Sequence, residues 1–228
     1  MKERLRENLD RIRTHIRHIC EKHHRNSQEI RLVVVTKTIP AEVVRELMAL
    51  DVQDLGENRV QEAKEKIRHI KEPFCWHMIG HLQTNKVKTA LEIFSTIHSV
   101  DSLKLAQAIN QQAEKVGKKV DVFLEVNTSG EEAKWGLRPE EVESVLNQIE
   151  SCQNIRILGL MTMAPLTDDA EWIRSTFKAL HNMRLKYNSR WKLSMGMSHD
   201  YPLALEEGAD ILRIGSAVFE GVLETNEK

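Results

Sequence analysis

The chain has 228 residues, of which 41% are hydrophobic and 29% are charged, as in an ordinary soluble globular protein with a sizeable core. Its 33 basic and 34 acidic side chains leave a formal charge of -1, so charge gives no reason to expect nucleic acid or an anionic membrane as a partner. No apolar run approaches the length of a membrane span. The three cysteines, Cys20, Cys75 and Cys152, are too far apart for a disulfide framework or a metal site, so we expect a reducing, cytoplasmic setting.

Residues 1–24 are expected to form an amphipathic helix rather than a signal peptide. The leucines and isoleucines recur at intervals of three and four residues, at Leu5, Leu9, Ile12, Ile16 and Ile19. Arginines alternate with acidic residues on the other face, which favours a solvated surface over a nucleic-acid patch. We therefore expect this helix to pack against the outside of the main domain.

The first strand is predicted at Leu32–Val35, and it ends in a lysine. The run is short, apolar and β-branched, which is typical of a strand buried on both faces of a parallel sheet. Lys37 follows the strand, and Pro40 then opens a helix. An ammonium group at a buried strand end is costly to desolvate unless it is paired or used, and lysine is the usual Schiff-base nucleophile. The alternative is a lysine that reaches solvent just past the strand.

The rest of the chain alternates regularly between strands and helices. Further strands are expected at Val52–Leu55, Phe74–Ile79, Ile93–Val100, Val120–Val126, Ile155–Met161, Trp191–Leu193 and Ala209–Ile214. Helices are expected at Ala41–Leu50, Arg59–Ile70, Lys86–Leu91, Leu103–Val116, Pro139–Ser151, Asp169–Lys186 and Tyr201–Glu207, with a short terminal helix after Ser216. Eight such units predict an α/β protein, a single (β/α)₈ barrel domain over residues 1–228. The alternative is a doubly wound open sheet, which usually has a glycine-rich turn after its first strand.

A closed barrel would make its first and eighth strands neighbours. Lys37 and Arg213 would then point to the same mouth. The loops after strands seven and eight, residues 195–198 and 215–216, offer glycines, two serine hydroxyls and a following helix amino terminus, which suit a phosphate group. A lysine beside a phosphate site suggests a phosphorylated aldehyde held as an imine.

Arg213 lies in an apolar strand, where a buried guanidinium needs a partner. If it faced a pyridine nitrogen, that nitrogen would stay unprotonated, which limits the electron-sink power of a pyridoxal ring. The alternative is an ion pair with a barrel carboxylate such as Glu125.

Four other positions allow more than one interpretation. His77 and His81 are four residues apart, but Gly80 lies between them at a strand end, so we expect no metal site. Asn58 could contact a ligand or serve only as a turn residue. Trp135 could belong to a lid or only anchor its loop.

Several short motifs then carry a resemblance over nearly the whole chain. They are Val35-Thr-Lys-Thr38, Gly56-Glu-Asn58, Trp76-His-Met-Ile-Gly80, Leu82-Gln-Thr-Asn-Lys86, Lys134-Trp-Gly136, Gly159-Leu-Met161, Ser194-Met-Gly-Met-Ser198 with Asp200, and Arg213-Ile-Gly-Ser-Ala217. In this order they resemble the pyridoxal phosphate homeostasis family. The resemblance implies a fold-type III barrel, similar to alanine racemase but without its carboxyl-terminal β domain.

The resemblance also assigns roles to individual residues. Lys37 would hold pyridoxal 5′-phosphate (PLP) as a covalent imine, and Arg213 would face the pyridine nitrogen. The phosphate would be held by three residues, Ser198, Gly215 and Ser216. The ring pocket would be lined by three more, Asn58, His77 and Met161. The family is regarded as non-catalytic, buffering the cofactor or delivering it to apo-enzymes, with effects on amino-acid and keto-acid balance. We expect a monomer.

Three positions depart from the family pattern. His81 stands at a variable position that is often proline, Ser216 replaces a common threonine, and Phe219-Glu-Gly221 carries an extra residue. The role of Gly221 is therefore open.

Two enzymatic hypotheses stand beside the carrier. A minimal PLP-dependent racemase or lyase would need a base, yet the related racemases use a tyrosine and this chain has only Tyr187, in an outer helix, and Tyr201, near the seventh strand. Without a cap domain the cofactor face should be open to water, which is poor for stabilising a carbanion. A phosphosugar aldolase would use Lys37 with no cofactor.

Overall fold

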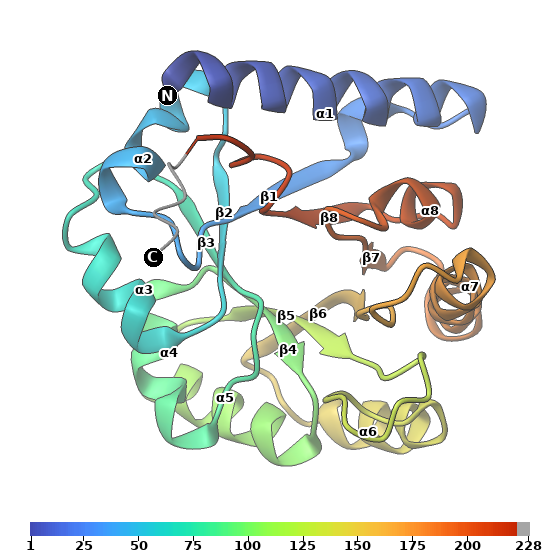
Figure 1. Cartoon of the computed structure of the whole chain (residues 1–228). Helices are drawn as coiled ribbons and strands as arrows, with labels where there is room; N and C mark the ends of the chain where they lie inside the picture. The colour runs from blue at the N-terminus through green and yellow to red at the C-terminus, as the bar shows by residue number, and fades with distance from the viewer. Residues whose placement is uncertain (223–228) are drawn as a thin grey trace.

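Eight parallel strands close into a barrel in the order in which they occur along the chain (Figure 1). The computed structural model describes residues 1–222. The strands are β1 (Arg31–Val35), β2 (Asp54–Glu57), β3 (Cys75–Met78), β4 (Thr96–Val100), β5 (Val120–Glu125), β6 (Ile155–Met161), β7 (Lys192–Ser194) and β8 (Ile211–Ile214). Closure comes from the pairing of β1 with β8, in which Val33 lies beside Arg213. The predicted (β/α)₈ barrel is confirmed, and the open sheet is excluded.

Helices surround the barrel. They are α1 (Lys2–Lys22), α2 (Ala41–Glu46), α3 (Val60–Ile67), α4 (Val87–Ile93), α5 (Leu103–Lys115), α6 (Val142–Ile149), α7 (Ala170–Tyr187) and α8 (Tyr201–Glu206). Short 3₁₀ turns lie at Ser27–Glu29, Met48–Leu50, Thr84–Lys86 and Pro139–Glu141. The barrel therefore has the expected layer of helices outside a layer of strands.

The expected extra helix at the amino terminus is α1. It buries its leucine and isoleucine face and packs against α8, which places it across the outside of the barrel (Figure 1). The Asn8 amide donates to the carbonyls of Val218 and Glu220, at 3.0 and 2.9 Å. The helix thus fastens the segment that follows β8.

The barrel interior contains a small apolar cluster that is separate from the large core between strands and helices. The inner cluster consists of Val33, Phe123, Met161 and Ile211. Because side chains alternate along a strand, Val35 continues the inward face that Val33 begins, whereas Val34 packs outward. Lys37 lies in the turn that follows β1, at the carboxyl-terminal mouth.

Several predicted elements differ from the structure. The strand predicted from Ile93 begins at Thr96, because Ile93 is the last residue of α4. The helix predicted over residues 41–50 divides into α2 and a 3₁₀ turn. The second strand lies two residues later than predicted, at Asp54–Glu57, because its register with β3 runs from Asp54 through Glu57. After β8, residues 216–222 form turns instead of the predicted short terminal helix, and any continuation lies outside the described residues.

Within the described residues, no helix is both long and apolar enough to cross a membrane.

Candidate functional site

Lys37 stands at the mouth of the barrel, just past β1. Its side chain is exposed, and no ion pair or hydrogen bond joins its ammonium to another of the described residues. A turn closed by the Ile39 N–H and the Thr36 carbonyl follows at once, with an N···O distance of 2.9 Å. The amine is therefore open to an approaching electrophile.

A buried ion pair fixes the backbone next to Lys37. Glu57, at the end of β2, is fully buried and accepts a hydrogen bond from the Thr36 hydroxyl at 2.7 Å. The Lys66 ammonium, from α3, bonds both the Glu57 carboxylate and the Thr36 carbonyl. Sequence reasoning missed this group, because Glu57 was placed beyond its strand and Lys66 reads as one of many helical lysines.

Arg213 is held inside the mouth by neutral partners. Only 3% of the residue is exposed. Its Nη1 donates to the Ser194 hydroxyl at 2.7 Å, and its Nη2 donates to the Thr162 carbonyl at 2.9 Å. Burial lowers the pKa of Arg213 to about 10, so the guanidinium remains charged at neutral pH.

The alternative ion pair between Arg213 and Glu125 is absent from the structure. Glu125 ends β5, is buried, and has a pKa raised to about 7, first by burial and then by the nearby charge of Asp101. Arg213 acts on it in the opposite direction. A carboxyl group that titrates near neutrality therefore lies at the mouth, and sequence reasoning named it only as a possible partner of Arg213.

The predicted phosphate loops come together. The hydroxyl of Ser198, after β7, accepts the backbone N–H groups of Gly215 and Ala217 at 3.3 and 3.2 Å. Ser216 lies between these two donors with its side chain exposed. A Cβ on Gly215 would lie 3.1 Å from the Val35 carbonyl oxygen, so glycine allows β8 to approach β1 closely. The Ser198 and Ser216 hydroxyls and the backbone of residues 215–217 thus gather beside β1, with the Gly215 and Ala217 N–H groups bonded to Ser198.

Asn58 follows β2 at the mouth, and its Oδ1 is buried without a hydrogen-bond partner among the described residues. A buried carbonyl oxygen of this kind costs free energy unless a donor reaches it. A Cβ at Gly80 would lie 2.4 Å from the Asn58 carbonyl oxygen, so Gly80 allows the loop after β3 to pack against Asn58. This favours the ligand-contact interpretation of Asn58.

His77 and Met161 lie deeper than the mouth loops. Met161 is fully buried in the inner cluster. His77, 1% exposed, bonds His98 through Nδ1 and Asp54 through Nε2, at 2.9 and 2.8 Å. Their predicted contact with a bound ring remains a prediction. His98, which sequence reasoning missed, carried no signal beyond a buried strand position.

The side chains of His81 and His77 have different hydrogen-bond partners. Its Nδ1 bonds the Asp101 carboxylate at 2.8 Å, and its ring stacks on Trp135 with 3.9 Å between centroids. Within residues 1–222, no three potential ligands of the His, Cys, Asp or Glu type gather into a metal site. Trp135, 59% exposed, thereby joins the loops after β3 and β5.

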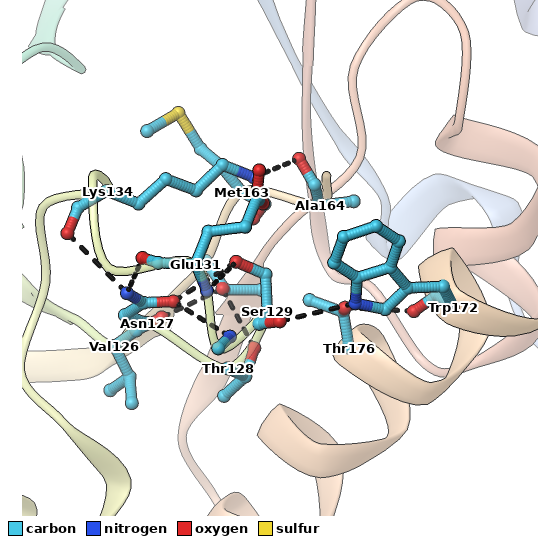
Figure 2. A network of polar contacts seen from close by, with 12 residues as sticks. Val126, Asn127, Thr128, Ser129, Glu131, Lys134, Met163, Ala164, Trp172 and Thr176 are labelled. Carbon is cyan, nitrogen blue, oxygen red and sulfur yellow. Dashed lines mark hydrogen bonds and ion pairs between the residues drawn. The ribbon is translucent and has the colours of Figure 1, made fainter. Parts of the chain in front are cut away.

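The loop after β5 is also bound to the loop after β6, as Figure 2 shows. The Lys134 ammonium donates to the Ala164 carbonyl at 2.8 Å, and the Trp172 indole N–H donates to the Ser129 carbonyl at 3.2 Å. The Asn127 amide closes the loop on itself through the Glu131 carbonyl at 2.8 Å. This side of the mouth is therefore held in shape by polar contacts.

A barrel with these mouth residues is of the alanine racemase N-terminal domain class. The model of that family, "Alanine racemase, N-terminal domain", matches residues 7–221. An alanine racemase from Clostridium difficile 630 superposes with a TM-score of 0.75 at 18% identity over 95% of this chain and 56% of the racemase, which shows the shared fold.

Relatives of higher identity define the family more narrowly. A pyridoxal phosphate homeostasis protein from Aquifex aeolicus is 39% identical over 93% of this chain and 96% of its own length. One from Pseudomonas aeruginosa is 37% identical over 93% and 94%. PipY of Synechococcus elongatus PCC7942, solved with PLP bound, has a TM-score of 0.81 at 32% identity over 94% of this chain and 99% of PipY. The chain belongs to the pyridoxal phosphate homeostasis protein family.

Proposed function

We propose that this protein binds PLP at the carboxyl-terminal mouth of the barrel, with Lys37 as the covalent anchor, and takes part in PLP homeostasis inside the cell. The observation that supports the proposal is the convergence at one mouth of a lysine without a partner among the described residues, the Ser198 and Ser216 hydroxyls, and a buried arginine. The PLP-bound relative supports the same choice of cofactor.

The residues at the mouth suit the three chemical parts of PLP, which are the phosphate, the pyridine ring and the aldehyde. Ser198, Gly215 and Ser216 would hold the phosphate, and Arg213 would face the ring nitrogen and keep it unprotonated. The unpaired Asn58 oxygen would accept a hydrogen bond from the ligand. When bound, PLP supplies an aldehyde that Lys37 can hold as an imine and a ring that can accept electron density. His77 and Met161 would support the ring from below.

A carrier fits this mouth better than an enzyme does. The two tyrosines, which a racemase of this class would need as a base, are engaged elsewhere. The Tyr201 hydroxyl bonds His15 of α1 at 2.6 Å, and the Tyr187 hydroxyl accepts from Lys186 at 3.2 Å. Both contacts lie on the outer helices. The protein would then hold and release PLP, buffering it or passing it to apo-enzymes, and so affect amino-acid and keto-acid balance.

The expectations of a monomer, of a cytoplasmic location and of transient apo-enzyme partners are part of this proposal. The three cysteines are all unpaired, which agrees with a reducing setting.

One observation favours the enzymatic alternative, a minimal racemase or lyase. Glu125 titrates near pH 7 at the mouth, which suits a proton donor or acceptor. Purified protein loaded with PLP and incubated with single L-amino acids separates the two functions. We expect product at the rate of free PLP. A rate well above that of free PLP, lost in Glu125→Gln, would establish the enzyme instead.

Binding itself is tested by titrating cofactor-free protein with PLP and recording visible spectra. We expect Arg213→Glu to bind more weakly and to shift the absorbance band, because a carboxylate cannot donate to the ring nitrogen. If neither affinity nor spectrum changes, Arg213 is structural and its assignment to the ring is wrong. For an aldolase that needs no cofactor, we expect no aldimine band that forms with PLP and is lost in Lys37→Ala.

A further inference from the structure

A chain of hydrogen bonds crosses the inside of the barrel from Arg213 to the opposite end. The Ser194 hydroxyl, which accepts from Arg213, also bonds His98 Nδ1 at 2.8 Å. His98 Nε2 bonds His77 Nδ1 at 2.9 Å, and His77 Nε2 bonds the Asp54 carboxylate at 2.8 Å. Four consecutive bonds therefore join side chains from β8, β7, β4, β3 and β2. The three middle members, Ser194, His98 and His77, are at most 1% exposed.

We propose that Asp54, His77, His98 and Ser194 form a one-way hydrogen-bond chain that positions the Arg213 guanidinium for the ring nitrogen of the cofactor. Only the last part of this proposal, the contact between Arg213 and the ring nitrogen, rests on the proposed PLP site. The chain itself is a property of the protein without cofactor, and it extends the site to the far end of the barrel.

The two ends of the chain fix its direction. Arg213 can only donate, and an ionised Asp54 can only accept. Ser194 therefore accepts from Arg213 and gives its own hydrogen to His98 Nδ1. His98 then donates from Nε2 to His77 Nδ1, and His77 donates from Nε2 to Asp54. Every donor meets an acceptor, and both imidazoles carry their single proton on Nε2.

The reverse arrangement of the two histidines is unfavourable. If His77 donated from Nδ1 to His98 while still donating to Asp54, His77 would carry a positive charge in the same interior as Arg213. His98 would have to donate to Ser194, and the Ser194 hydrogen would have no acceptor among the described residues. Burial also holds the pKa of His98 well below its ordinary value of 6.5, which agrees with a neutral ring.

The chain links Arg213 to a further carboxylate, Asp54, in addition to Asp200 and Glu125, whose charges raise the pKa of Arg213 against the effect of burial. No carboxylate lies within ion-pair distance of its guanidinium in the described part of the chain, and its direct partners are a hydroxyl and a carbonyl. Hydrogen bonds in a low-dielectric interior polarise one another, so the Asp54 charge strengthens each bond back toward Arg213. The His98 ring is also stacked on Phe123, with 4.6 Å between centroids, which keeps it from rotating.

The far end of the chain meets solvent. Asp54 has a side chain that is 19% exposed and lines a cavity of about 630 Å³ at the amino-terminal end of the barrel. Arg31 lies on the other side of this carboxylate, with 3.7 Å between Nε and Oδ2. Asp54 is thus a positioning residue that never touches the cofactor, and a change there should be felt at the mouth.

Nitrogen-15 NMR of histidine-labelled, cofactor-free protein tests the chain directly. We expect both His77 and His98 to show a protonated Nε2 and an unprotonated Nδ1, assigned with single-histidine variants. Asp54→Ala should shift the ring-nitrogen signals of His77 most and those of His98 less. A protonated Nδ1 on either ring, or His98 signals that do not respond to Asp54→Ala, would overturn the proposal.

Ser194→Ala tests the link to the cofactor, with Ser99→Ala as its control. Ser99 is fully buried next to His98, and its Oγ has no hydrogen-bond partner in the described part of the chain. We expect Ser194→Ala to weaken PLP binding about tenfold, roughly the effect of losing one hydrogen bond to a charged group, and to shift the absorbance band. Ser99→Ala should change binding less than about twofold.

The outcomes separate this inference from the proposed function. If wild-type protein binds no PLP while the NMR pattern holds, the chain stands and the cofactor assignment fails. If wild-type protein binds PLP but Ser194→Ala binds it equally well with an unchanged spectrum, the positioning role is wrong. If Ser194→Ala does not fold, Asp54→Ala provides the same binding and spectral readout from the exposed end.

Discussion

The mouth of the barrel holds two cations from neighbouring strands, and the structure treats them in opposite ways. Lys37 is exposed, and its ammonium has no partner among the described residues. Arg213 is buried and donates to two fixed oxygens. Hydrogen bonds among Thr36, Glu57 and Lys66 fix the backbone next to Lys37. None of these bonds involves the Lys37 amine.

This difference separates two kinds of work. A lysine that must form and release a covalent bond needs mobility and access to solvent, whereas a group that sets the charge beside a ring needs one fixed orientation. Changes around Arg213 should therefore alter electrostatics and binding. Changes at Lys37 should remove the proposed covalent bond and leave the fold intact, whereas changes to the Glu57–Lys66 pair beneath it should lower the stability of the fold.

The largest effect on the unfolding free energy is expected from breaking the Glu57–Lys66 ion pair beneath Lys37. Lys66→Met would leave the fully buried Glu57 carboxylate without its cation, which typically costs about 3–5 kcal/mol of unfolding free energy. The control is Lys64→Met, on the same helix, whose partner Glu92 is exposed. That change should cost under about 0.5 kcal/mol. Urea unfolding of both variants measures the difference, and equal stability would show that the Glu57 pair does not support the mouth.

A smaller effect on stability, which depends on pH, is expected from Glu125 near Arg213. Its folded pKa of about 7 lies above the ordinary 4.5, so the folded state binds the extra proton between these values. Stability contributed by Glu125 is therefore complete below about pH 4.5 and is lost as pH rises through 7, by up to about 3 kcal/mol. Glu125→Gln should remove this loss.

The measurement is unfolding free energy against pH for wild type and variant. Buried His98 acts in the opposite direction, losing stability in acid, so only the difference between the two curves isolates Glu125. Glu132→Gln, at an exposed glutamate, should reproduce the wild-type curve. A difference that does not change between pH 5 and 8 would mean that Glu125 is ionised throughout.

The smallest effect on stability is expected at Lys37 itself. Lys37→Ala removes an exposed side chain that has no partner among residues 1–222, so the unfolding free energy should change by less than about 0.5 kcal/mol. Thermal or urea unfolding of the cofactor-free variant measures it. A loss above about 2 kcal/mol would show that Lys37 has a structural role and would weaken the contrast with Arg213.

The strand–helix alternation was readable from the sequence because each buried strand is a short apolar run and each helix has a periodic apolar face. The neighbouring positions of Lys37 and Arg213 followed from counting eight units and closing the barrel. For Ser198, Gly215 and Ala217, the sequence indicated only two loops of a composition that suits a phosphate. It did not indicate the hydrogen bonds between these loops.

The other features of the site could not be predicted from the sequence, because they depend on residues that come together only in the folded structure. His98 and Asp54 are separated by more than 40 positions in sequence, and their spacing carries no motif. The burial of Glu57 followed from a strand register that local composition misplaced by two residues. The end of β8 looked like a helix start, yet residues 216–222 form turns whose carbonyls meet Asn8 of α1.

Borohydride reduction of PLP-loaded protein, followed by peptide mass mapping, tests the central claim most directly. The reagent fixes an imine as a stable secondary amine, so the modified lysine can be identified. We predict one phosphopyridoxyl group per chain on the peptide that contains Lys37, and none in Lys37→Ala under the same conditions. Modification of a different lysine in the wild-type protein, or no stable adduct despite a bound cofactor, would contradict the account.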